Sequence, residues 1–226
     1  MRLEPTAAGG TLRLQGSSST IVGGAVVVGR NAISGGSQGT LVIQDTATLT
    51  AGSMRLGDND RVSGNVTQSG GSVTVNGELR IAHWPNHTST YTHSNGSLSA
   101  GSINVGWDGT GVLNHSGGSI TVNGTLAVGA HAGSGATVTI SGGTLSASNF
   151  MLGQFSGAAG TVNQTNGDVT TSNLRIGHYP NETSTYTLSG GTITVTGTPG
   201  GVVNPVGIGE QQGILYLGVD GTGNFT

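Results

Sequence analysis

The chain has 226 residues, of which 44 are glycine and only 8% are charged, and its formal net charge is -3. All of its basic residues are arginine, and this near-neutral balance lacks the basic stripe or cationic patch expected of a protein that binds nucleic acid or an anionic membrane. The absence of cysteine excludes disulfides and Cys-based zinc or redox motifs, and no apolar run is long enough for a bilayer-spanning helix, so we expect no membrane insertion.

The opening residues Met1 to Pro5 lack the apolar segment of a signal peptide, so we expect any export signal to have been removed or not included. Leu12 then fits a partial first unit of a repeat. A motif of Leu/Ile/Val, any residue, Ile/Val/Leu and usually Gly follows about every 24 residues and predicts about eight units. The motif starts at Val26, Met54, Leu79, Ile103, Leu126, Phe150, Leu174 and Leu215, with an insertion near residues 199–214 before the last unit.

Each unit contains two further apolar positions, separated by glycine-rich turns. Apolar and polar residues alternate around all three positions, which is typical of short β-strands with one buried face. The second position is occupied by Leu41, Val66, Tyr91, Leu113, Val138, Val162, Tyr186 and Phe225. The third is occupied by Leu49, Val73, Leu98, Ile120, Leu145, Val169 and Ile193.

A unit with three one-sided strands cannot bury its own apolar face, whereas stacked units align equivalent residues into a continuous core. The sequence therefore predicts a single all-β domain over residues 1–226, a right-handed parallel β-helix with about 24 residues and three short strands per coil. The alternative is an antiparallel sandwich or barrel, which also has short strands and glycine turns. The same positions recurring at every coil favour the β-helix.

Turns of the Ser-Gly-Gly-Thr-Leu type, followed by alternating apolar residues, carry a resemblance to known proteins; they occur at Ser69 to Val75, Ser116 to Val122, Ser141 to Ala147 and Ser189 to Val195. The pattern resembles the β-helical repeats of bacterial surface proteins, including autotransporter passenger domains and exported repeat proteins of planctomycete-like bacteria. The resemblance implies a right-handed β-helix, export to the cell surface and an adhesive or structural role. It transfers no catalytic residue.

The ten acidic residues are scattered over different positions of their units, whereas polysaccharide-degrading β-helices cluster carboxylates on one face. Asp58 and Asp60 are close neighbours that bind calcium weakly or form a solvated turn, and we favour the turn. His93 and His115 are expected to stack in the core on adjacent coils. His83 and His178 lie too many coils apart to share a metal. We expect no enzyme, no cofactor and no metal site.

A loop at residues 83–91 is duplicated at residues 178–186, and it places aromatic rings beside Asn and hydroxyl groups. Such a combination suits a platform for sugars, but Pro and aromatic residues also pack long turns, and both interpretations stay open. The candidate ligand-binding residues are His83, Trp84, Asn86, Trp107, His178, Tyr179 and Asn181.

Outward positions beside the third apolar column are rich in hydroxyl groups, as in Ser72, Thr74, Ser119, Thr121 and Thr192. Such arrays occur on ice-binding β-solenoids and on ordinary solvated sheets, so ice binding is a minor alternative. We expect a non-enzymatic, extracellular structural or adhesive module. Its partners are expected to be further coils, joined covalently or stacked end to end into filaments, and glycans. A carbohydrate-binding module is the alternative, and a polysaccharide-degrading β-helix is a further minor one.

Overall fold

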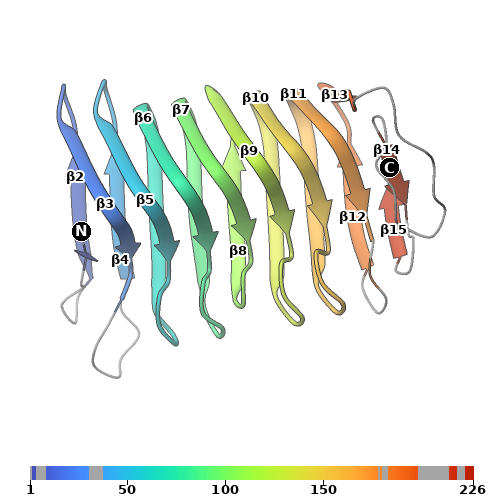
Figure 1. Ribbon diagram of the computed structural model, residues 1–226, viewed down its shortest axis with the longest axis horizontal. Helices are drawn as coiled ribbons and strands as arrows, with labels where there is room; N and C mark the ends of the chain where they lie inside the picture. Colours follow the sequence, from blue (N-terminus) through green and yellow to red (C-terminus); the bar gives the residue numbers. More distant parts are fainter. Residues whose placement is uncertain are drawn as a thin grey trace.

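The computed structural model describes residues 2–3, 9–30, 38–177, 179, 183–197, 214–217 and 222–226. These residues form an all-β protein, without a helix in any described segment, in which parallel coils stack into a solenoid of about seven turns with about 24 residues per turn. The coils wind in a right-handed sense from the N-terminal to the C-terminal end of the rod (Figure 1). The predicted fold is confirmed, with about seven turns where the repeat predicts about eight units.

Fifteen strands make one sheet that wraps around the rod. The strands are β1 (Arg2–Leu3), β2 (Gly10–Leu14), β3 (Ser19–Val28), β4 (Gln38–Ile43), β5 (Thr48–Leu56), β6 (Ser63–Ile81), β7 (Thr88–Val105), β8 (Thr110–His115), β9 (Ser119–Val128), β10 (Gly135–Leu152), β11 (Ala159–Ile176), β12 (Thr183–Leu188), β13 (Thr192–Val195), β14 (Ile214–Leu217) and β15 (Thr222–Phe225). The predicted insertion lies outside the described residues except for Ile214.

In the longest strands, the three predicted strands of a unit run together into one. This happens because the backbone keeps its hydrogen bonds to the neighbouring coil through the corners of the rod. The 19 residues of β6 and the 18 residues of β7 each pass through three faces of the rod. We name these faces by their buried residues in β7: the Tyr91 face, the Leu98 face and the Ile103 face. The segment that leads from the Ile103 face to the next Tyr91 face is a loop. The described loops of this kind, 57–62, 82–87, 106–109, 129–134 and 153–158, form the loop edge at the bottom of Figure 1.

The parallel register stacks equivalent residues of successive coils. Leu98 lies between Val73 and Ile120, and all three side chains are at most 1% exposed. The Tyr91 and Ile103 faces follow the same rule, with Tyr91 in register with Leu113 and Ile103 in register with Leu126. The stacking predicted from the repeat is confirmed, and it gives the core its continuity along the axis.

The Tyr91 face also buries a polar column inside the core. Gln68 accepts a hydrogen bond from the Tyr91 hydroxyl at 2.7 Å and donates to the Ser97 carbonyl at 2.9 Å. On the next coils, Nδ1 of His93 lies 3.0 Å from Nδ1 of His115, as expected for stacked core histidines. Hydrogen bonding offsets the cost of burying these groups.

Candidate functional site

The loop edge carries the most varied chemistry of the rod, in contrast to the uniform faces. Its segment 82–87 connects β6 to β7 and bends sharply, because Ala82 and Asn86 adopt positive φ angles of 59° and 62°. The bend leaves Asn86 exposed and Trp84 45% exposed, whereas His83 turns toward the rod. Two of the predicted site residues, His178 and Asn181, lie outside the described residues.

Aromatic rings of successive coils contact one another along this edge and form what we call the ring ladder. Ring centroids are 6.3 Å apart between the first two members, then 4.2 Å, 5.5 Å and 6.3 Å. The members are His83, Trp107, His131, Phe155 and Tyr179. The structure therefore brings three predicted residues, His83, Trp107 and Tyr179, into one row.

Sequence reasoning missed His131 and Phe155, although a signal was present. Trp107, His131, Phe155 and Tyr179 follow one another at the length of one coil, and a search for rings at that interval would have found the row. Trp84, which we predicted to belong to the site, points instead into solvent as one of the exposed large apolar side chains.

Trp107 is enclosed by its neighbours. The guanidinium carbon of Arg80 lies 3.8 Å from the centre of its ring, and His131 packs on it as well. Arg80 is itself held by Glu78, whose Oε2 accepts a hydrogen bond from Arg80 Nε at 2.8 Å. Contacts of this kind stabilise the edge. Trp107 thus packs against its neighbours in the turn, whereas the rings of Trp84 and Phe155 are 45% and 46% exposed.

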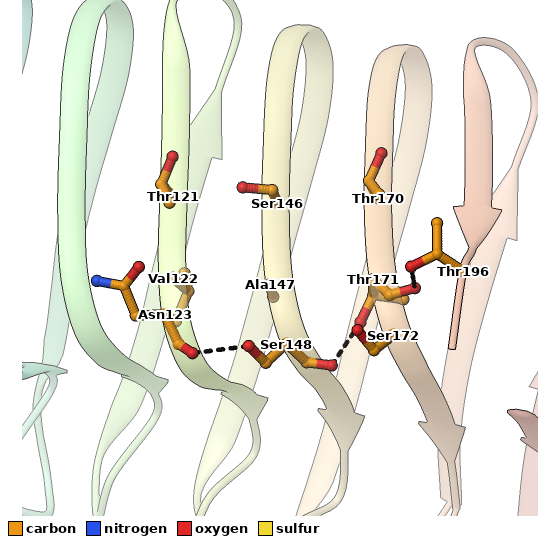
Figure 2. Close-up of a pocket in the computed structure, with 10 residues that line it drawn as sticks. All are labelled: Thr121, Val122, Asn123, Ser146, Ala147, Ser148, Thr170, Thr171, Ser172 and Thr196. Carbon is orange, nitrogen blue, oxygen red and sulfur yellow. Dashed lines mark hydrogen bonds between the residues drawn. The ribbon is translucent and has the colours of Figure 1, made fainter. Parts of the chain in front are cut away.

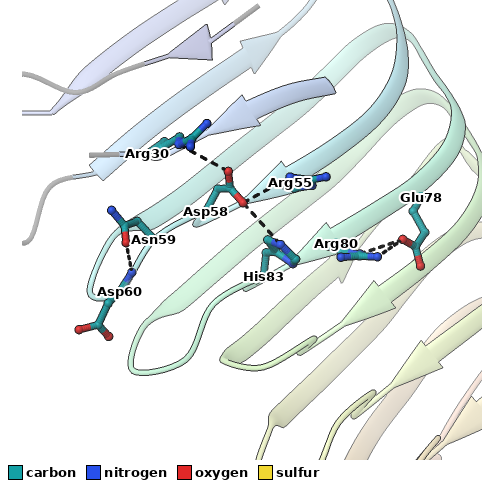
Figure 3. A network of polar contacts seen from close by, with 8 residues as sticks. All are labelled: Arg30, Arg55, Asp58, Asn59, Asp60, Glu78, Arg80 and His83. Atoms are coloured by element: carbon teal, nitrogen blue, oxygen red, sulfur yellow. Dashed lines mark hydrogen bonds and ion pairs between the residues drawn. The ribbon is translucent and has the colours of Figure 1, made fainter. Parts of the chain in front are cut away.

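Asp58 anchors the N-terminal end of the loop edge (Figure 3). Its side chain is 7% exposed, and the carboxylate lies 3.8 Å from Arg30, 3.7 Å from Arg55 and 3.5 Å from Nε2 of His83. Burial lowers the pKa of His83, and this effect exceeds the opposite influence of Asp58. His83 is therefore a neutral partner of Asp58 at neutral pH.

The calcium interpretation of Asp58 and Asp60 finds no support in this arrangement. The Asp58 side chain points toward its cationic partners, whereas Asp60 points away from them (Figure 3). Asp60 instead accepts a hydrogen bond from Nδ2 of Asn86 at 3.0 Å and pairs with Arg61 at 3.7 Å. No group of three or more potential metal-ligating side chains occurs among the described residues.

A cavity of about 380 Å³, which we call the loop pocket, opens between three consecutive coils at this edge. Its walls carry a carboxylate, an amide, an imidazole and hydroxyl groups, but no arginine. Oδ1 of Asp108 accepts a hydrogen bond from Nδ1 of His131 at 2.7 Å beside it. The lining residues are Pro85, Asn86, His87, Thr88, Asp108, Gly109, Thr110 and Gly133.

A second hollow of about 260 Å³, the hydroxyl groove, lies where the Leu98 face bends into the Ile103 face (Figure 2). Several of its hydroxyl groups are bonded to the preceding coil: Ser148 donates to the Asn123 carbonyl at 2.7 Å, and Thr196 donates to the Thr171 carbonyl at 3.3 Å. These bonds tie the coils together. The groove belongs to the hydroxyl array predicted from the sequence.

The array is regular but incomplete. Thr144, Asp168 and Thr192 occupy one outward column in register, so a carboxylate interrupts the hydroxyl groups and accepts a hydrogen bond from Thr192 at 2.6 Å. At the N-terminal side Ile21, 79% exposed, stands in register with Thr50.

No protein-family model, no curated protein and no solved structure matches this chain. None of the described segments forms a helix that is long and apolar enough to cross a membrane.

Proposed function

We propose that this chain is a non-enzymatic, extracellular structural module of the adhesive kind, which holds its loop edge toward other surfaces. The observation that carries the proposal is the contrast between uniform faces and a varied edge. The faces repeat Ser, Thr and Asn from coil to coil, whereas the edge changes from imidazole to indole to phenyl. In repeat proteins, loops that project on one side of a regular scaffold commonly carry recognition.

The scaffold supports such a role physically. Each coil is bonded to its neighbours by in-register parallel pairing, as between β6 and β7 or between β10 and β11, so the edge is held at a fixed spacing of about 4.8 Å per coil. A row of weak contacts on a rigid frame binds a repetitive surface more strongly than any single contact does.

Carbohydrate binding by the loops is a second candidate function, and exposed rings beside polar groups favour it. Trp84 and Phe155 present ring surface at an edge that also carries the Asn86 amide and the Asp108 carboxylate. Amphipathic rings of this kind pack on the apolar side of a sugar while polar groups bind its hydroxyls.

Adhesion is tested with the whole chain coupled to beads and exposed to surfaces coated with neutral polysaccharides, acidic polysaccharides or protein. We expect retention on at least one surface and a lower retention for the variant Trp84→Ala combined with Phe155→Ala. A matched variant on the Leu98 face, Thr121→Ala combined with Ser146→Ala, is expected to adhere like the unchanged chain. Equal retention of all three chains contradicts a role for the loop edge.

Two further measurements address the rest of the proposal. Release of reducing ends from any of the polysaccharides by the pure chain contradicts a non-enzymatic role. Self-association by end-to-end stacking of coils belongs to the same proposal, since parallel strand edges with equivalent columns are complementary to one another. Light scattering over a concentration series tests it, and a constant monomer mass rules it out.

A further inference from the structure

We infer that the loop pocket binds a single neutral pyranose unit of a glycan, with the Asp108 carboxylate accepting hydrogen bonds from its hydroxyl groups. This inference rests on the proposed adhesive function and names the ligand class of its edge. The pocket differs from the ring ladder because its walls are polar, and from the hydroxyl groove because it contains a carboxylate and is larger, at about 380 Å³ against about 260 Å³.

The pocket is held rigid by backbone contacts between coils. The amide of Asp108 donates to the Ala82 carbonyl at 3.2 Å, and the amide of Thr110 donates to the His87 carbonyl at 2.9 Å. At Gly109 the two loops approach so closely that an added Cβ atom would lie 2.4 Å from the Trp84 carbonyl oxygen. A site fixed in this way loses little conformational entropy when a ligand binds.

The polar groups of the pocket suit a ligand that is rich in hydrogen-bond donors. Asp108 is 41% exposed, and its carboxylate keeps acceptor capacity after one oxygen binds His131. Thr88 and Thr110 stand in register on adjacent strands and are both exposed, so they add two hydroxyl groups at one wall. The hydrogen bond from Asn86 to Asp60 fixes the orientation of the amide at another wall.

The charge and shape of the pocket restrict the class of ligand further. A carboxylate without a lining arginine disfavours anionic sugars and phosphates, because the like charges repel. The Pro85 ring supplies an apolar surface, which matches the mixed polar and apolar faces of a pyranose. The cavity volume lies within the range of small-molecule sites. A divalent cation is the competing ligand, because Asp108 and the amide oxygen of Asn86 are oxygen donors.

The test is a titration of the isotope-labelled whole chain, followed by amide chemical shifts in nuclear magnetic resonance spectra. The probes are methyl glycosides of glucose, galactose, mannose and N-acetylglucosamine, with glucuronic acid as the anionic comparison, each titrated once with EDTA and once with calcium. We expect one neutral sugar to shift the amides of Thr88, Asp108 and Thr110 with an affinity in the millimolar range, and glucuronic acid to bind more weakly.

Asp108→Asn keeps the size of the side chain and removes its charge, and it is expected to weaken sugar binding about tenfold or more, which is the loss of one charge-assisted hydrogen bond. Thr110→Val gives an independent change of the same pocket. Asp168→Asn, which removes an exposed carboxylate from the Leu98 face, serves as the control of matched charge and is expected to bind sugar like the unchanged chain.

The inference is overturned if none of the sugars shifts the pocket amides, or if the shifts occur only with calcium and vanish in EDTA. Bead adhesion that is identical for Asp108→Asn and the unchanged chain, together with absent sugar shifts, rejects the pocket and leaves the adhesive function standing. Sugar shifts without any bead adhesion reject the adhesive function and keep the pocket.

Discussion

At the scale of single residues, the buried histidine pair leaves one polar atom of the core without a hydrogen bond. Nε2 of His115 lies 3.1 Å from the Thr144 carbonyl, so this nitrogen carries the proton and Nδ1 of His115 accepts from Nδ1 of His93. Nε2 of His93 is then an unprotonated acceptor, and it is buried without a partner. Burial, reinforced by His115, lowers the pKa of His93 to about 4.

We expect this pair to make the chain sensitive to acid. Between the unfolded pKa of about 6.5 and the folded pKa of about 4, the unfolded chain binds more protons, so stability falls as the pH drops through this window. The loss attributable to His93 amounts to about 3 kcal/mol at most. Urea unfolding between pH 4 and pH 7.5 measures it.

The double variant His93→Leu with His115→Ile replaces both histidines with residue types that already occur in the same column, at Leu188 and Ile140. It is expected to flatten the pH dependence of the free energy of unfolding. His83 and His87, whose pKa values are also lowered by burial, contribute to the dependence that remains. His131→Gln at the exposed edge is the control. An unchanged slope in the double variant would show that the pair does not cause the acid sensitivity.

A second prediction concerns the corner glycine Gly143, which has a φ of 77°. An added Cβ atom would lie 2.7 Å from the Gly118 carbonyl oxygen and 2.8 Å from the His115 ring. We expect Gly143→Ala to lower the free energy of unfolding by about 2–4 kcal/mol, from backbone strain and steric overlap together. Gly24→Ala is the control for denaturation, because an added Cβ atom there would meet no atom within 4 Å apart from its chain neighbours. An equal loss of unfolding free energy in both variants would refute the steric argument.

At the scale of elements, the loop edge combines packing and exposure in neighbouring aromatic residues. Trp107 is covered by Arg80 and His131, whereas the neighbouring coil projects Trp84 into solvent. The difference follows from the position in the loop: Trp107 comes two residues after the strand residue Val105, and Trp84 comes three residues after Ile81, where the chain has already turned outward.

This contrast predicts different effects of the two tryptophans on stability. Trp107→Ala removes a cation-π contact and two ring contacts, and we expect it to lower the free energy of unfolding by about 1–3 kcal/mol. Trp84→Ala is expected to change stability by less than about 0.5 kcal/mol while it reduces adhesion. Thermal unfolding and bead retention, measured on both variants, separate packing from recognition. A large stability loss in Trp84→Ala would place this ring in the packing group instead.

At the scale of the whole molecule, each coil contacts mainly the coils before and after it. The pairing of β7 with β9, and of β9 with β10, joins three successive coils on the Leu98 face. The stability of such a rod is close to the sum of the intrinsic stabilities of its coils and the interaction energies between neighbouring coils. A defect therefore destabilises its own coil and the adjacent coils most.

Ile120→Asp tests this view, because it places a charge between Leu98 and Leu145 in a fully buried column. We expect the free energy of unfolding to fall by roughly 3–5 kcal/mol. Hydrogen exchange is expected to accelerate more in β7, β9 and β10 than in the distant strands β4 and β5. Ile120→Val, which keeps the site apolar, is expected to cost only about 1 kcal/mol. Uniformly faster exchange along the rod would show global rather than local coupling.

The sequence alone determined the solenoid, because a repeat that buries equivalent columns is satisfied only by stacking, and the positions of Leu98, Tyr91 and Ile103 could be read from their spacing. It also identified the stacked pair of His93 and His115. The row of rings recurs at the length of one coil and was readable from the sequence, whereas the loop pocket was decided by tertiary structure. Side chains in the loops point according to backbone turns such as the positive φ at Ala82 and Asn86, which no periodicity dictates. Contacts between loops, such as that of Asp108 with His131, join successive coils whose residues lie 23 positions apart in the chain but side by side in space.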